Sequence, residues 1–75
     1  MNKQKIATNA TILWKLMNER DWTLDELRQA SNLNENALAM AIGWLVREDS
    51  ISIIENEKSQ TEIYRKTFNS YNSYY

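Results

Sequence analysis

A chain of 75 residues is long enough for one domain and no second. Its 9 basic and 10 acidic side chains leave a formal net charge of −1, and 43% of the residues are hydrophobic, as in a soluble globular protein. Cysteine and histidine are both absent, which excludes disulfides and thiolate chemistry and removes the usual zinc ligands and the usual general base. We therefore expect a protein that is not an enzyme and uses no metal and no cofactor.

The small size of the chain predicts self-association. A domain of this length buries only about 60% of the surface of its unfolded chain, so its own core contributes only a few kcal/mol. Without disulfides or a metal, oligomerisation is the stabilising device that remains. No apolar run approaches the roughly 18 residues of a membrane span, and the polar start of the chain lacks the apolar region of a signal peptide. We expect a cytoplasmic homodimer that does not associate with a membrane.

Two helices are predicted in the first half of the chain. Residues 6–18 carry apolar side chains at helical spacing, namely Ile6, Ala10, Leu13 and Met17. Thr23 is followed three residues later by Glu26, the spacing of a capping box, in which each side chain bonds the other residue's backbone N–H. The second helix is therefore expected to begin at Leu24 and to end near Ala30.

A third helix and a β-hairpin follow. Asn34 is expected to cap a helix over residues 35–48, because its side chain can accept from the first free backbone N–H groups. The hydrophobic period then changes from 3.6 to 2 over residues 51–55 and 61–65, which predicts two strands. The polar residues 56–60 between them are typical of a hairpin turn.

The predicted core combines one side of each helix with residues of the strands. Its members are Leu13, Met17, Leu27, Leu38, Ile42, Leu45, Ile51, Ile53 and Ile63. Trp14 and Trp22 are interpreted as core and turn anchors. Residues 67–75 contain Phe68 and three tyrosines but no aliphatic side chain, so we expect a disordered tail after a domain of residues 1–66.

The order helix, short helix, turn, longer helix and hairpin resembles a winged helix-turn-helix domain. Residues 22–27 look like the start of the second helix of that fold, and Leu33 resembles the apolar residue of its turn. Trp14, the run AIGWL at residues 41–45 and the pair at 47–48 resemble a family of small bacterial winged helix-turn-helix proteins of unknown function. The resemblance implies an α+β fold of three helices and a wing, and a dimer. It implies no established activity.

The distribution of charge bears on whether the third helix reads DNA. Residues 21–49 carry two basic and six acidic side chains, and the hairpin region has three of each. DNA binding gains much of its free energy when cations replace the counterions of phosphates, and this unit is short of cations. A DNA-binding transcriptional regulator nevertheless remains the alternative function, with double-stranded DNA as the partner. Its contact residues would be Asn34, Asn36, Ala39, Arg47 and Lys58.

Helical geometry instead predicts an apolar contact surface on the third helix. With Leu38, Ile42 and Leu45 pointing inward, the outward arc consists of Asn36, Ala39, Met40, Gly43, Trp44 and Arg47. Exposed patches of this kind mark interfaces, and the glycine lets a partner approach closely. The predicted protein interface is formed by Ile12, Met40, Gly43 and Trp44. The alternative is that Trp44 folds back on the first helix or the wing and completes the core of the monomer.

Overall fold

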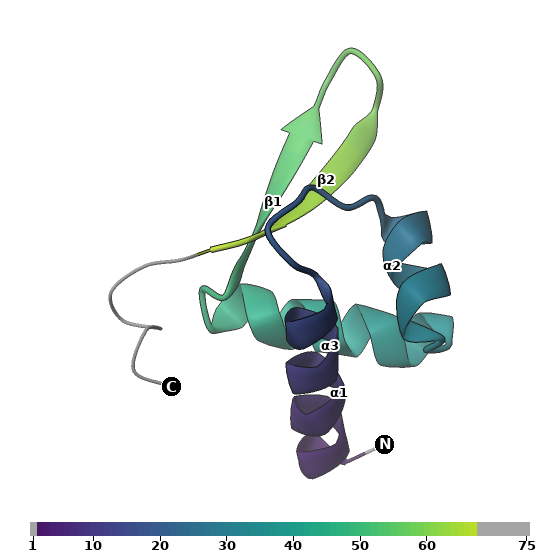
Figure 1. Ribbon diagram of the computed structural model, residues 1–75, viewed down its shortest axis with the longest axis vertical. Coiled ribbons are helices and arrows are strands. Elements are labelled where there is room, and N and C mark those ends of the chain that lie inside the picture. Colours follow the sequence, from purple (N-terminus) through teal and green to yellow (C-terminus); the bar gives the residue numbers. More distant parts are fainter. Residues whose placement is uncertain (1, 68–75) are drawn as a thin grey trace.

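The computed structural model describes residues 2–67 and arranges them as three helices followed by a two-stranded antiparallel sheet (Figure 1). The elements are α1 (Lys3–Leu16), α2 (Leu24–Ser31), α3 (Glu35–Arg47), β1 (Ile51–Asn56) and β2 (Thr61–Lys66). The predicted α+β class and the predicted order of elements are confirmed. Among residues 2–67, no helix has the length and apolar character needed to cross a membrane. Of the predicted disordered tail of residues 67–75, all but Thr67 lies outside the described residues.

Helix α1 begins earlier than its hydrophobic pattern predicts. The side chain of Asn2 accepts a hydrogen bond from the backbone N–H of Lys5 at 2.8 Å and caps the helix. The apolar stripe starts only at Ile6, so the cap and the polar first turn were not part of the predicted helix. Helix α1 ends at Leu16, and the chain turns at Asn18, whose φ is 51°.

Left-handed backbone positions in this chain are occupied by residues other than glycine. Asn18, Asn32, Asp49 and Gln60 have positive φ, and the first three are of the types that tolerate this conformation best. The single glycine, Gly43, lies instead in the middle of α3 with a φ that is not positive. No turn therefore requires this glycine.

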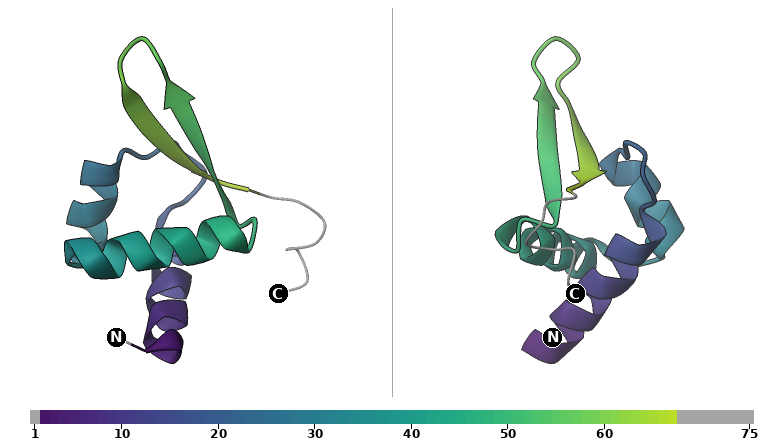
Figure 2. Two further views of the ribbon diagram at one scale, coloured as in Figure 1. Left: turned by 180° about the vertical axis from the view of Figure 1, so that it is seen from behind. Right: turned by 60° about the vertical axis from the view of Figure 1, so that its left-hand side comes forward.

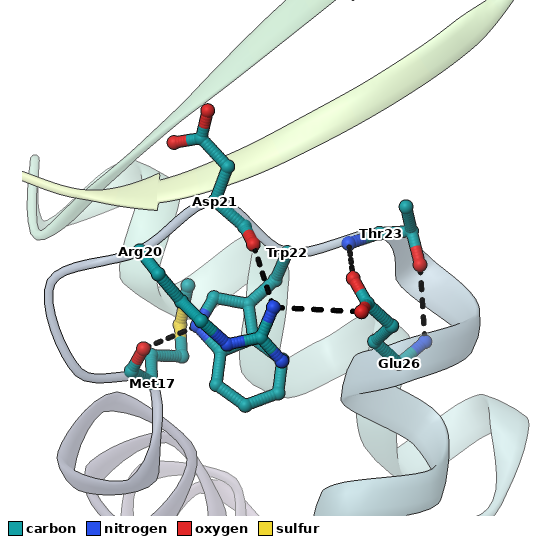
Figure 3. A network of polar contacts seen from close by, with 6 residues as sticks. All are labelled: Met17, Arg20, Asp21, Trp22, Thr23 and Glu26. Atoms are coloured by element: carbon teal, nitrogen blue, oxygen red, sulfur yellow. Dashed lines mark hydrogen bonds and ion pairs between the residues drawn. The ribbon is translucent and has the colours of Figure 1, made fainter.

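The start of α2 has the predicted capping box. The Thr23 hydroxyl accepts from the backbone N–H of Glu26 at 3.2 Å, and a Glu26 carboxylate oxygen accepts from the backbone N–H of Thr23 at 2.9 Å (Figure 3). Asn34 caps α3 in the simpler way, because its side chain accepts from the backbone N–H of Ala37 at 2.8 Å. Each helix of the helix-turn-helix unit thus begins at the residue that the sequence predicts.

The capping box makes a stability prediction. Thr23→Ala removes the hydroxyl that satisfies an N-terminal N–H of α2, and we expect the free energy of unfolding to fall by about 1 kcal/mol. Thr8→Ala is the control, because the Thr8 hydroxyl is exposed and bonds only to the Gln4 carbonyl within α1. Urea unfolding followed by circular dichroism measures both variants. Equal losses would show that the cap contributes nothing.

The core lies where α1 and α3 cross, with α2 beside the N-terminal part of α3 (Figure 1). Its buried hydrophobic residues are Ala10, Leu13, Met17, Trp22, Leu27, Ala37, Leu38, Ala41, Ile42, Leu45, Ile51 and Tyr64. All helical residues predicted for the core are therefore confirmed. Tyr64 is a core residue that was not predicted, because the alternation of side chains in its strand alone does not mark it as buried.

The hairpin stands away from the helices, and only its base joins the core (Figures 1 and 2). Strands β1 and β2 are antiparallel with Ile53 opposite Tyr64 and Ile54 opposite Ile63. The prediction that Ile53 is a core residue is wrong: it is 40% exposed, because only the first residue of β1, Ile51, is buried against the core. Ile63 is half-buried rather than fully enclosed.

Trp22 adds one further pairing to the sheet. Its backbone N–H donates to the Tyr64 carbonyl at 2.9 Å, and the Tyr64 N–H donates to the Trp22 carbonyl at 2.8 Å. Its indole N–H donates to the Met17 carbonyl (Figure 3). The predicted anchor role of Trp22 is confirmed, and this residue ties the link between α1 and α2 to the base of the wing.

Candidate interaction site

Three arginines of the described chain are held by carboxylates of the helix-turn-helix region. Arg20 lies over the ring of Trp22, 3.5 Å from its centroid, and its Nη1 is 3.4 Å from a Glu26 carboxylate oxygen (Figure 3). Arg65 donates two hydrogen bonds to Asp21, at 2.6 and 2.9 Å. In α2, Arg28 donates one hydrogen bond from Nη2 to a carboxylate oxygen of Asp25. These cations neutralise the protein's own acids, so they are poorly placed to neutralise phosphates.

The paired carboxylates make the fold sensitive to acid. Hydrogen bonds from Arg65 hold the pKa of Asp21 below its ordinary value, and the hydrogen bond from the Thr23 backbone lowers the pKa of Glu26. A carboxyl group with a lower pKa in the folded state stabilises the fold above its unfolded pKa, and this contribution is lost as the pH falls through its folded pKa. We therefore expect stability to fall on acidification below about pH 5.

The acid sensitivity is measured by the urea midpoint between about pH 6 and pH 3. The double variant Asp21→Asn, Glu26→Gln is expected to start from a lower midpoint at neutral pH and to lose less of it on acidification. The exposed carboxylate Glu57, in the hairpin turn, provides the control Glu57→Gln. If the double variant and the control lost the same amount as the wild type, the pH dependence would have another origin.

The outward face of α3 is polar only at its ends. Asn36 is exposed in the first turn and Arg47 in the last, and between them lie Ala39, Met40 and Gly43, which are all exposed. Met40 is 46% exposed, a large fraction for a hydrophobic side chain in the middle of a helix. Val46 adjoins this strip and is 38% exposed. We call the four exposed residues Ala39, Met40, Gly43 and Val46 the α3 surface.

Gly43 lies at the centre of the α3 surface. A Cβ atom built on it would meet no other atom of residues 2–67 within 4 Å. Glycine within a helix costs about 1 kcal/mol relative to alanine, because it loses more conformational entropy on folding. Neither the backbone conformation nor the packing of the single copy requires glycine at this position. The open space above it allows a second backbone to come close to α3.

Trp44 lies less far outward than its helical position predicts. It is half-buried and packs against the core together with Trp14 and Leu16. The structure therefore places it at the edge of the α3 surface, one turn from Met40, with part of the side chain accessible. Trp44 therefore contributes to the monomer core, and its role in a protein interface stays a prediction.

A groove between α1 and α3 runs along this edge. It has a volume of about 510 Å³ and is lined by Ala10, Thr11, Trp14, Lys15, Trp44, Leu45, Glu48 and Ser50. Trp14 is fixed in the wall, since its indole N–H donates to the Ser50 carbonyl at 3.2 Å and the ammonium of Lys66 lies 3.9 Å from its ring centroid. The groove was not predicted, because it forms only where two helices distant in sequence cross. The tryptophan content was the one available signal.

The remaining predicted site residues are spread over the molecule. Ile12 is 53% exposed on α1, and it is not among the residues that line the groove. Asn34 uses its side-chain oxygen to cap α3, which favours the capping interpretation over base reading. Lys58 is exposed in the hairpin turn, and the opposed residues Glu55 and Glu62 lie near the turn in β1 and β2.

Residues 2–67 contain no group of three acidic side chains that could hold a metal ion and no buried polar or charged side chain. The perturbed pKa values belong to surface ion pairs, to a capping carboxylate, to Tyr64 and to Lys66 over Trp14. The features that require a functional explanation are therefore the α3 surface and the adjoining groove.

Comparison with known proteins identifies similar chains. The family model described as "Winged helix-turn-helix domain (DUF2582)" matches residues 1–65. The structure is similar to the solution NMR structure of protein BT2368 from Bacteroides thetaiotaomicron, with 35% sequence identity and a TM-score of 0.71. That match covers 87% of this chain and 79% of the other. No curated protein matches the chain.

Proposed function

Since the chain belongs to the winged helix-turn-helix family DUF2582, whose fold is typical of transcription-regulator-like proteins, we propose that it acts as a non-enzymatic association domain. Two copies bind each other through the α3 surface, with Trp44 at its edge. The position that a DNA-binding relative would use for its recognition helix serves here as a protein interface.

Gly43 is the observation that carries this proposal. A glycine in the middle of a helix weakens that helix, and nothing among the described residues compensates for the loss. A second helix packed across this position provides the reason, because the missing side chain allows the two backbones to approach. Met40, one turn before, supplies a flexible apolar side chain that adapts to the partner's contour.

Charge supports the same proposal. The middle of the exposed face of α3 carries no charged side chain, and apolar contacts free of charge are characteristic of the centre of protein interfaces. Around it, Arg20, Arg28 and Arg65 are paired with carboxylates of their own chain. A surface of this composition gains free energy by burial against a similar surface, whereas it offers little to a phosphate backbone.

Sedimentation equilibrium tests the proposal. We expect a mass of twice 8.9 kDa for the wild type and of 8.9 kDa for Met40→Glu, because the introduced carboxylate would be buried in the interface without a partner. Ala30→Glu is the matched control, since Ala30 is exposed on α2 and lies outside the α3 surface. This control should remain a dimer. A monomeric wild type, or a dimer unaffected by Met40→Glu, would contradict the proposal.

DNA binding is the other function that this fold can serve, and Asn36 and Arg47 are exposed on α3 where such contacts would be made. A fluorescence titration with labelled duplex DNA at increasing salt distinguishes DNA binding from the proposed association function. The association domain is expected to show weak binding that does not depend on Arg47. Tight binding that falls steeply with salt and is lost in Arg47→Glu would assign the surface to DNA instead.

A further inference from the structure

One edge of the hairpin has no neighbouring strand. The sheet consists of β1 and β2, and β2 has a further partner on its other side, at the bridge between Tyr64 and Trp22. On the outer side of β1, no strand of residues 2–67 pairs with it. Beyond its buried first residue, all of β1 is exposed, and the hairpin stands away from the helices (Figures 1 and 2). This edge is therefore accessible to another chain.

The hydrogen bonds of Tyr64 show which backbone groups of β1 point to this edge. Tyr64 directs its N–H and its carbonyl at Trp22, at 2.8 and 2.9 Å, and therefore away from β1. In an antiparallel pair, two residues directly opposite either bond each other or both point away. Ile53 lies opposite Tyr64, so its N–H and carbonyl point to the outer edge. Glu55, two residues further along β1, is oriented in the same way.

The side chains along this edge are unusual for a strand that lacks a neighbour. Ile53 is 40% exposed on one face, and Ile54 is 38% exposed on the other, where it lies opposite Ile63. Proteins usually protect exposed strand edges with proline, lysine or a bulge. β1 contains neither proline nor lysine, and its register with β2 runs without interruption. An added strand would bury isoleucine on both faces of the sheet and gain free energy from this burial.

The charges near the hairpin turn define the chemistry of the partner. Glu55 lies directly opposite Glu62, and like charges in this arrangement destabilise a sheet. Glu57 adds a third carboxylate in the turn, whose one cation is Lys58. A lysine or arginine from a partner, placed beside Glu55, relieves this repulsion. A second copy of β1 does not supply it, because Ile51–Asn56 contains no basic residue.

We propose that β1 binds an extended segment of another protein, which adds a third strand at the outer edge of the hairpin. The segment carries two adjacent aliphatic residues, which pack on Ile53 and Ile54, and a lysine or arginine beside Glu55. Antiparallel pairing is the more stable arrangement, and it places this cation on the N-terminal side of the aliphatic pair. The edge lies outside the α3 surface, so the inference does not depend on dimerisation.

Hydrogen exchange with a synthetic peptide tests the pairing. The probe is Thr-Lys-Val-Val-Thr-Thr with blocked ends, whose lysine and valines lie opposite Glu55, Ile54 and Ile53 in the antiparallel register. We expect the peptide to slow the exchange of the Ile53 and Glu55 amides, which point outward. The Ile54 amide points to β2, so its exchange should change less. Unchanged exchange of Ile53 and Glu55 at millimolar peptide would overturn the proposal.

Charge reversal tests the chemistry of the partner. A peptide with glutamate in place of its lysine is expected to bind the wild type several-fold more weakly, and to bind Glu55→Lys more tightly than the lysine peptide does. Glu35→Lys is the matched control, because Glu35 is exposed at the start of α3, outside the hairpin, and this variant should keep the wild-type preference. Equal affinity of the two peptides for the wild type would overturn the proposal.

A proline at the edge tests the role of the backbone. Ile53→Pro removes the outward N–H and no bond to β2, so we expect loss of peptide binding with an unchanged circular dichroism spectrum. Ile53→Val keeps the N–H and should bind as the wild type does. Retained binding in Ile53→Pro would show that the peptide does not pair with this edge, and would overturn the proposal.

Discussion

Leu27→Ala is expected to lower the free energy of unfolding by about 2–5 kcal/mol. Leu27 is completely buried in the core, and truncation leaves a cavity that a small core closes only in part. A chain of this length has a total stability of only about 4–11 kcal/mol, so the variant loses a large fraction of it. The loss is large because α2 has no other buried residue.

The same helix supplies the control for this prediction. Leu24 is 47% exposed at the start of α2, and Leu24→Ala removes the same atoms from a site that water already reaches. We expect a change well below that of Leu27→Ala. Urea unfolding at one fixed protein concentration measures both, because dimerisation makes the apparent stability depend on concentration. Similar losses in the two variants would mean that the assigned core is incorrect.

Substitutions at Gly43 are expected to act in opposite directions on folding and on association. Gly43→Ala adds a Cβ atom in open space, so it should stabilise the single copy by about 1 kcal/mol through helix propensity. The same atom reaches into the space that a partner helix would occupy, so the dimer should dissociate at higher concentration. Gly43→Glu should abolish the dimer and leave the fold intact.

The effects of these substitutions on folding and on association are measured separately. Urea unfolding in dilute protein reports the stability of the single copy, and sedimentation equilibrium over a range of concentrations reports the dissociation constant. Ala30→Glu again serves as the control for an added carboxylate on an exposed helical position. Gains in both stability and association for Gly43→Ala would mean that this glycine is not part of the interface.

The helical part of the fold follows from local chemistry, and the sequence therefore predicts it well. The capping side chains of Thr23 and Asn34 each act within three residues, so their hydrogen bonds require no knowledge of the rest of the molecule. The wing is different. Alternation predicts two strands there, but Ile53 is exposed and Tyr64 is buried because of where the hairpin stands relative to the helices. That placement depends on the pairing of Tyr64 with Trp22, which is distant in sequence.

The candidate site, like the fold, can be predicted from the sequence only in part. The periodicity of α3 is enough to place Met40 and Gly43 on an exposed face, and the structure agrees. Trp44 is displaced toward the core because α1 crosses α3 on that side and brings Trp14 against the same groove. A helical projection of α3 alone contains no information about this crossing. Ile12, on the exposed side of α1, stays a predicted interface residue.

Dimerisation through the α3 surface is tested most directly by whether the methyl group of Met40 contacts a second copy. In an equal mixture of isotopically labelled and unlabelled protein, filtered nuclear Overhauser experiments detect only contacts between different chains. We predict such contacts from the Met40 methyl group to protons on α3 of the partner, and none from the fully buried Met17. Interchain contacts that avoid α3, or no interchain contacts at concentrations well above micromolar, would contradict it.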